Sequence, residues 1–404
     1  MAAPDPAPAD TAPVARAALE ADPHGMLARL RAAVPFIRTD DGVVMLLRAA
    51  DIQALVTDPR TRQVETEFAM LRGITEGPLY EFFRLTALLS NGEVHRRRRA
   101  PMARSFAFQA VAALRPRVRA LAEDLVAARA ARGRMNLVAD YASPLPARAI
   151  AAILGLPERD VPDFTRLVYA MARTLSSAYR PEDRPEAEAA ACRLTDYVDR
   201  LVAERRRAPR DDLISAFVPL IDAGDAEAAA ETRMQIVSLI LAGSDTTRAA
   251  LAIQIGLLLS HPAQWQAVCR DEALIPGAVA EALRYEPAVG SYPRFTLEAI
   301  PLDGGVLPAG ALVSFSTLSA LRDPALCARP EVFDIRRSDH PRWHLVFGGG
   351  AHRCLGEALA RMELEEGMRA LTARLPGLRL DAPLTVRGSA GIRRVEEVPV
   401  SWPA

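Results

Sequence analysis

The sequence lacks an excess of charge of either sign, and this limits the partners that it can have. Its 404 residues include 50 Lys and Arg against 50 Asp and Glu, so the formal net charge is zero. A general nucleic-acid binder needs a basic surplus to meet the phosphate backbone. We therefore expect no nucleic-acid partner.

Long apolar runs, a secretory leader and paired cysteines are missing as well. No run of about 18 consecutive apolar residues occurs, so no membrane span is expected. Residues 1–13 have neither the basic nor the apolar region of a signal peptide. The cysteines are far apart and form no CxxC pair, which argues against a zinc module and a disulfide scaffold. We expect a cytoplasmic protein whose thiols are reduced: Cys192, Cys269, Cys327 and Cys354.

Helix-forming sequence is abundant. Half of the residues are hydrophobic, which is enough to build a large buried core. From about residue 105 to residue 260 the pattern is mostly helical and rich in Ala, Leu, Arg and Glu. Prolines predict the breaks between these helices, at Pro144, Pro157, Pro181, Pro209 and Pro219.

A small β part is predicted beside the helices. The apolar run 43–47 follows an Asp-Asp-Gly turn signal and is typical of a strand. Residues 295–297 and 311–315 flank two glycine-containing turns and indicate a small antiparallel sheet. We therefore predict a mainly α fold with a minor β part. The predicted organisation is a disordered Pro/Ala-rich tail, 1–14, followed by a single domain, 15–404.

The segment 347–356 combines three glycines with a cysteine. Gly348 to Gly350 allow close backbone approach and unusual dihedral angles, and the apolar spacing after Cys354 indicates a helix. A thiolate near a helix N-terminus is favoured by the helix dipole and by free N–H groups. A buried structural cysteine, a phosphate loop, a phosphatase-type cysteine and a zinc site are the alternatives. None fits well, since Arg353-Cys354 stands where a phosphate loop has Lys-Ser/Thr and only His352 could share a zinc ion.

A second unusual segment, Ala242 to Thr247, lies within a long apolar helix predicted from about Arg233 to Ser260. Glycine costs a helix about 1 kcal/mol relative to alanine, and a buried aspartate needs polar partners. A functional site is expected where a strong helix breaks such local rules. A polar stripe that faces solvent is the alternative.

The motif Phe347-Gly348-x-Gly350-x-His352-x-Cys354-Leu355-Gly356 resembles the haem-binding signature of the cytochrome P450 family. The resemblance implies the family's fold, in which the haem lies between the oxygen-activation helix and the helix that follows the cysteine. It also implies that Cys354 is the thiolate ligand of the iron in haem b (iron protoporphyrin IX), where it favours O–O cleavage.

Further segments resemble family landmarks in the same order along the chain. Glu281 and Arg284 match a buried Glu-x-x-Arg pair, which implies a structural role. Thr246 and Asp245 match the oxygen-activation motif, in which the alcohol assists oxygen activation and the acid relays protons. Leu321 is a departure, because an Asn often stands at this position before Arg-Asp-Pro. The implied propionate partners are His95, Arg99, Arg294 and His352, and the other implied haem contacts are Phe347, Gly348, Ala242 and Gly356.

The resemblance implies a monooxygenase that inserts one oxygen atom into an apolar small molecule. The chain has no flavin or iron–sulfur module, so electrons are expected from a ferredoxin or flavodoxin served by an NAD(P)H-dependent reductase. We expect a monomer on which Arg353 and some of the residues 96–98 form a basic docking patch, with a solvated surface as the alternative. A peroxide-driven haem enzyme and a non-catalytic haem sensor or carrier are the rival functions. The candidate pocket residues are Leu241, Ala242, Val289 and Ile392.

Overall fold

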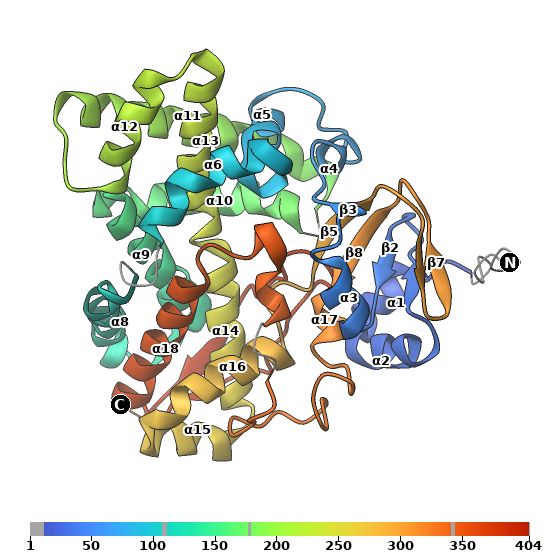
Figure 1. Ribbon diagram of the computed structural model, residues 1–404. Coiled ribbons are helices and arrows are strands. Elements are labelled where there is room, and N and C mark those ends of the chain that lie inside the picture. The colour runs from blue at the N-terminus through green and yellow to red at the C-terminus, as the bar shows by residue number, and fades with distance from the viewer. Residues whose placement is uncertain (1–11, 107–110, 177–178, 341–343, 404) are drawn as a thin grey trace, which may run out of the picture. The chain divides into compact units, whose positions relative to one another are not determined.

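The computed structural model describes residues 12–106, 111–176, 179–340 and 344–403. The chain divides into two compact units, which we describe one at a time (Figure 1). Unit one comprises Met1–Val64, Ala280–Cys354 and Val386–Arg394, and unit two comprises Glu65–Val279, Leu355–Thr385 and Val395–Ala404. Most of the predicted tail lies outside the described residues, although Val14 forms a parallel bridge to Thr39. The single domain over 15–404 stays a prediction.

Unit one is built on a five-stranded sheet in the order β1-β2-β8-β5-β3. The predicted strand 43–47 is β2, and the predicted antiparallel pair is β5 and β8, in which Phe295 faces Leu312. The intervening turn at Asp303 and Gly304 closes a separate hairpin of β6 and β7. The strands are β1 (Phe36–Arg38), β2 (Val44–Leu46), β3 (Thr61–Arg62), β5 (Ser291–Thr296), β6 (Ile300–Leu302), β7 (Gly305–Leu307) and β8 (Leu312–Ser316).

Short helices cover this sheet. Asp22 starts α2 by accepting a hydrogen bond from the Gly25 N–H at 3.0 Å, and Pro23 occupies the first turn, where its missing N–H costs nothing. The buried side chains of Leu19, Leu27 and Met45 then form one apolar cluster with their neighbours. The helices of unit one are α1 (Arg16–Ala21), α2 (Pro23–Ala33), α3 (Ala49–Leu55), α17 (Thr317–Ala320) and the C-terminal half of α16 (Ile275–Tyr285).

Unit two is helical apart from a small sheet, in the order β4-β10-β9. Its central helices, α13 and α14, are buried on most of their surface, and α14 packs against α9 and α18 (Figure 1). The strands are β4 (Arg134–Asn136), β9 (Arg379–Leu380) and β10 (Pro399–Ser401). The helices are α4 (Glu67–Met70), α5 (Pro78–Leu85), α6 (Gly92–Ser105), α8 (Arg115–Ala130), α9 (Pro144–Leu154), α10 (Val161–Ala172), α11 (Arg184–Arg207), α12 (Leu213–Ala223), α13 (Ala226–Ala242), α14 (Asp245–Leu259), α15 (Pro262–Arg270) and α18 (Glu357–Arg374).

Four of the five predicted proline breaks are confirmed, and one is wrong. Pro144 occupies the first turn of α9, Pro157 and Pro181 lie at the starts of short 3-10 turns, and Pro209 separates α11 from α12. Pro219, however, lies inside α12. The buried apolar face of this short helix, including Phe217 and Ile221, packs well enough to tolerate the hydrogen bond that proline removes.

The long apolar helix is longer than predicted and is interrupted. It begins at Ala226 because Asp225 accepts a hydrogen bond from the Ala228 N–H at 2.9 Å. It breaks at Gly243 and Ser244, between α13 and α14, and ends at Leu259 as expected. By length and composition, Ala226–Leu259 could cross a membrane, but 67% of its most apolar window is buried, as in the core helix of a soluble protein.

Candidate haem and oxygen-activation site

In unit one, Cys354 ends a tight hairpin and is exposed. Its backbone N–H donates to the Phe347 carbonyl at 2.8 Å, which closes the hairpin. The guanidinium of Arg353 donates to the Gly348 carbonyl at 3.1 Å. The exposure of Cys354 argues against the alternative of a buried structural cysteine.

The three glycines of this hairpin are required for two different reasons. Gly348 and Gly350 have φ values of +67° and +60°, which side-chain-bearing residues adopt only with strain. Gly349 has an ordinary extended backbone, but a Cβ there would lie 2.9 Å from both methyl carbons of Val56. The prediction of unusual dihedrals and close approach is confirmed.

A buried, positively charged corner lies on β5 of the same unit. Arg294 is buried, donates to the Gln63 side-chain oxygen and lies 5.2 Å from the ring of Tyr292. The Tyr292 hydroxyl is buried and has no hydrogen-bond partner among the described residues. Burial raises the pKa of Tyr292 to about 12, although Arg294 and then Arg353 oppose this. An unpartnered phenol beside two guanidinium groups fits an anionic ligand such as a haem propionate.

In unit two, the oxygen-activation segment lies at the break between α13 and α14. Ala242 is exposed and Thr246, four residues later on the same helical face, is half-buried. Asp245 and Thr247 are buried, so the alternative of a polar stripe facing solvent is wrong. The Thr246 hydroxyl lies 3.4 Å from the Ala242 carbonyl. This exposed helix face carries a small residue and an alcohol, and it would accommodate a flat cofactor.

Asp245 has a partner that the sequence analysis did not identify. Both Nη2 and Nε of Arg248 bind its Oδ1, at 2.6 and 3.0 Å. Arg248 also lies 4.5 Å from the ring centre of Tyr169. The spacing of three residues along one helix is a signal that could have revealed this pair.

Helix α6 carries the other predicted propionate partners, His95 and Arg99. His95 is buried, and burial together with the charge of Arg99 lowers its pKa. A neutral His95 donates one hydrogen bond without adding charge. Arg99 is half-buried, four residues along the same helix face.

The alternative of a solvated surface over residues 96–98 is wrong for Arg98. Its side chain is buried and donates to Glu231 at 2.8 Å and to the Arg84 carbonyl at 2.9 Å. Arg97 is exposed but also binds Glu231, at 2.8 Å, and Arg96 binds Glu93. Since each of these guanidinium groups has an acidic partner, they offer less net positive charge to a docking protein than the sequence suggests.

Glu281 and Arg284 form a fully buried ion pair in unit one. Nε and Nη2 of Arg284 bind the two carboxylate oxygens at 2.7 and 2.8 Å. Arg337, at 3.2 Å, and His340, at 3.1 Å, also reach Glu281. Burial acts against the carboxylate, but these donors prevail and lower the pKa of Glu281 to about 2. The pair therefore stays ionised and ties α16 to the loop 321–340.

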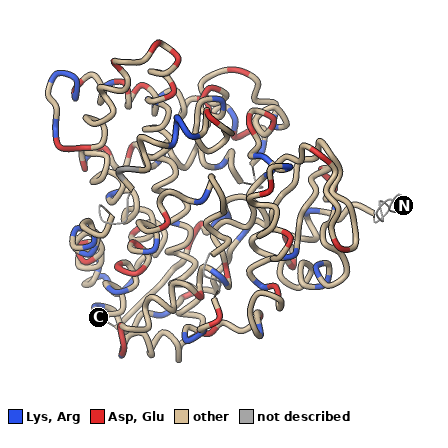
Figure 2. Tube along the Cα trace, in the orientation of Figure 1, with Lys and Arg blue, Asp and Glu red and all other residues tan. Residues whose placement is uncertain are grey.

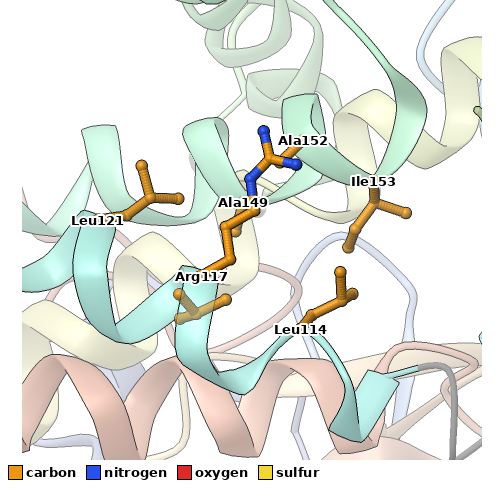
Figure 3. Close-up of a pocket in the computed structure, with 7 residues that line it drawn as sticks. Leu114, Arg117, Leu121, Ala149, Ala152 and Ile153 are labelled. Carbon is orange, nitrogen blue, oxygen red and sulfur yellow. The ribbon is translucent and has the colours of Figure 1, made fainter.

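The candidate pocket residues are only partly brought together. Val289 and Ile392 face each other across an antiparallel bridge in unit one and are half-buried. Leu241 is buried in unit two, whereas its neighbour Ala242 is exposed. Figure 3 shows a different, small recess between α8 and α9 in unit two, whose lining includes Leu114, Arg117 and Ile153. None of the predicted site residues lines this recess.

The helical fold, the cysteine hairpin and the open face of the long helix define a haem-thiolate protein. The family model for cytochrome P450 matches residues 159–371, which is more than half of the chain. Cytochrome P450-pinF1, a plant-inducible protein of Rhizobium radiobacter, is 43% identical over 97% of this chain and 92% of the relative. Cytochrome P450 monooxygenase PikC of Streptomyces venezuelae is 34% identical over 95% and 91%, respectively. The crystal structure of CalO2 is 31% identical, with a TM-score of 0.88 over 96% of this chain and 97% of that one.

This chain belongs to the cytochrome P450 family. Its fold is the predicted one, mainly α with small sheets. At the level of the family it is a haem-thiolate monooxygenase, an oxidoreductase that incorporates oxygen.

Sequence reasoning missed three residues near the predicted site. Tyr292 shares a strand face with Arg294 by the two-residue period, so its place could have been inferred. Arg248 lies one helical turn from Asp245. Glu363, on α18, is buried beside Thr247, and no local pattern predicts this position.

Proposed function

We propose that this chain binds haem b through Cys354 and inserts one oxygen atom into an apolar small molecule. The exposed Cys354 at the end of its glycine hairpin is the observation that carries the proposal. When bound, the haem supplies the iron at which O2 is activated. The propionates would be bound by His95, Arg99, Arg294 and His352. Tyr292 would join them, because its buried hydroxyl has no hydrogen-bond partner among the described residues and could donate to an anion.

The protein's own residues would manage protons and position the reactants. Thr246 would donate a hydrogen bond toward the reacting oxygen, and Asp245 would pass protons to it. Phe347, Gly348, Ala242 and Gly356 would contact the haem faces, since Ala242 is exposed and the other three are half-buried. Leu241, Ala242, Val289 and Ile392 are the proposed substrate contacts.

Electrons would come from a ferredoxin or flavodoxin with its NAD(P)H-dependent reductase. We further propose that residues 15–404 form one domain and that the protein is a cytoplasmic monomer. The relatives align over 95–97% of this chain, which supports a single domain. The burial of Ala226–Leu259 supports a location away from the membrane.

Replacement of the proposed ligand tests the haem site. Cys354→Ser should abolish the carbon monoxide difference band that gives the family its name, because serine does not supply a thiolate. The matched control is Cys192→Ser, which changes an exposed cysteine on α11. A thiolate-type spectrum retained by Cys354→Ser and lost by Cys192→Ser would overturn the assignment.

Replacement of the proposed alcohol tests the oxygen-activation role. Thr246→Ala should keep haem binding but divert reducing equivalents to hydrogen peroxide, with product yield falling by about 10- to 100-fold because a positioned proton donor is lost. Thr246→Ser retains the hydroxyl and should stay close to the parent. Substrates for this assay come from a spectral screen of the ferric protein against a compound library. Unchanged product per reducing equivalent in Thr246→Ala would contradict the role.

The same assay decides between the rival functions. Turnover with hydrogen peroxide but not with a ferredoxin system would favour a peroxide-driven enzyme. Spectral binding without oxidation by any donor would favour a sensor or carrier.

A further inference from the structure

A tight turn precedes Ile392, one of the proposed substrate contacts in unit one. Gly388 and Gly391 have φ values of +96° and +63°, which residues with side chains adopt only with strain. Ile392 comes directly after the turn and pairs with Val289 across an antiparallel bridge. The path of residues 388–391 therefore decides where the Ile392 side chain lies.

The first N–H groups of this turn are bound by a carboxylate from the opposite end of the chain. Oε2 of Glu20, on α1, accepts a hydrogen bond from the Gly388 N–H at 2.9 Å. Oε1 accepts from both the N–H and the hydroxyl of Ser389, at 2.8 and 2.6 Å. Hydrogen bonds to an ionised acceptor are stronger than those between neutral groups. Ser389 is completely buried, so removal of the carboxylate would leave two buried donors without this acceptor.

The rest of the turn is held by contacts that do not involve α1. The Gly391 carbonyl accepts a hydrogen bond from the Gly290 N–H at 2.8 Å. The buried guanidinium of Arg393 donates to the Gly388 carbonyl at 2.7 Å and also binds Glu286. These contacts fix the second half of the turn and one carbonyl of the first half. The carboxylate on α1 is the group that fixes the N–H side of the first half.

The turn lies directly against the segment that carries Val289. A Cβ at Gly290 would lie 3.0 Å from the Ser389 carbonyl oxygen, so the two backbones are in close contact there. Val289 and Ile392 are both half-buried. A displacement of Ser389 would therefore alter the spacing of these two side chains.

We propose that Glu20 is a positioning residue that sets the shape of the substrate pocket by fixing the turn 388–391 before Ile392. The inference rests on the proposed function, in which Val289 and Ile392 contact the substrate. Without the carboxylate, the first half of the turn shifts and the Ile392 side chain takes other positions. Affinity for bulky apolar ligands then changes, whereas affinity for a ligand too small to reach Ile392 does not.

Hydrogen exchange measured by mass spectrometry reports on the anchor without any haem chemistry. Glu20→Ala should speed exchange of the Gly388 and Ser389 amides by about 10- to 100-fold, because a hydrogen bond to a charged acceptor is lost. Glu20→Gln keeps one acceptor oxygen and should give an intermediate rate. The matched control is Glu298→Ala, which removes an exposed carboxylate elsewhere in unit one and should leave this turn unchanged. Parent-like exchange in Glu20→Ala would overturn the anchor.

Spectral titration of the ferric protein with two iron ligands then tests the role in specificity. The probes are imidazole, which is small, and 4-phenylimidazole, whose phenyl group occupies apolar space. Glu20→Ala should change the dissociation constant of 4-phenylimidazole by about tenfold, the effect of roughly one methylene contact in an apolar pocket, and that of imidazole by no more than about twofold. Equal changes for the two probes, or no change for either, would contradict the specificity role.

A double-variant cycle shows whether Glu20 acts through Ile392. Ile392→Ala should itself change the affinity for 4-phenylimidazole, and adding Glu20→Ala should then have little further effect. Fully additive changes would refute the proposed route through Ile392. A protein without a thiolate-type haem spectrum would instead refute the proposed function, and hydrogen exchange would still decide whether Glu20 anchors the turn.

Discussion

Glu363 shows how one buried residue can control stability without touching the proposed chemistry. It is completely buried on α18, and this burial raises the pKa of its carboxyl well above the ordinary value, with only the Thr247 hydroxyl acting against the shift. A carboxyl in this setting is neutral in the folded protein. Burying this carboxyl lowers the free energy of unfolding only at pH values where the unfolded chain releases the proton.

The resulting pH dependence has a definite sign. Above the ordinary glutamate pKa of about 4.3, the unfolded chain loses this proton while the folded protein keeps it. The free energy of unfolding should therefore fall as pH rises, by up to about 1.4 kcal/mol per pH unit, until the raised pKa is reached. Glu363→Gln, which is neutral in both states, should lack this contribution. Urea unfolding midpoints across the neutral range measure the difference.

The matched control for Glu363 is Glu93→Gln, which alters an exposed carboxylate on α6. Its unfolding midpoint should follow the parent's pH dependence. Parallel curves for Glu363→Gln and the parent would show that Glu363 is not held neutral in the folded protein.

The glycine hairpin before Cys354 shows how an element is shaped by what it packs against. At Gly349, only the side chain of Val56 leaves no room for a Cβ. At Gly350, φ is positive and a Cβ would also lie 3.1 Å from the Val56 carbonyl oxygen. A side chain can be shortened by mutation, but a carbonyl cannot. The two glycines should therefore respond differently to a compensating change.

Gly349→Ala should destabilise the hairpin by about 1–3 kcal/mol through overpacking and lower haem retention. Gly349→Ala/Val56→Ala should recover most of the loss, because the added methyl then occupies space that Val56 has vacated. Gly350→Ala/Val56→Ala should not recover, since neither the backbone strain nor the carbonyl contact is removed. Haem content and thermal unfolding midpoints provide the measurements. Equal behaviour of the two double variants would contradict this account.

The interrupted helix α13–α14 illustrates a second tertiary effect on an element. A Cβ at Gly243 would lie 2.7 Å from the Ile150 side chain on α9. The glycine therefore allows α9 to approach at the point where the helix breaks. The sequence predicted a site at the polar residues around Gly243. It did not predict that α9 would pack closely against this glycine.

At the scale of the whole molecule, every one of the 50 basic side chains is an arginine, because the sequence contains no lysine. Acidic and basic positions are interspersed along the traces of both units (Figure 2). Guanidinium groups stay charged when buried and bind carboxylates with two N–H groups. Arg205, Arg284 and Arg393 are accordingly among the largest fully buried side chains.

The amino-acid sequence alone determined the fold class, the family and the positions of Cys354, Asp245 and Thr246 on their segments. The fold class follows from local spacing and helix period, which require no knowledge of distant contacts, and the family follows from the resemblance of the motifs around these residues. Tertiary structure decided the burial of Arg98 and the position of Glu363 beside Thr247. It also decided the orphaned Tyr292 hydroxyl and the placement of Tyr169 against Arg248. Such partners come from segments far apart in the chain, and only the packing of the elements selects which of them meet.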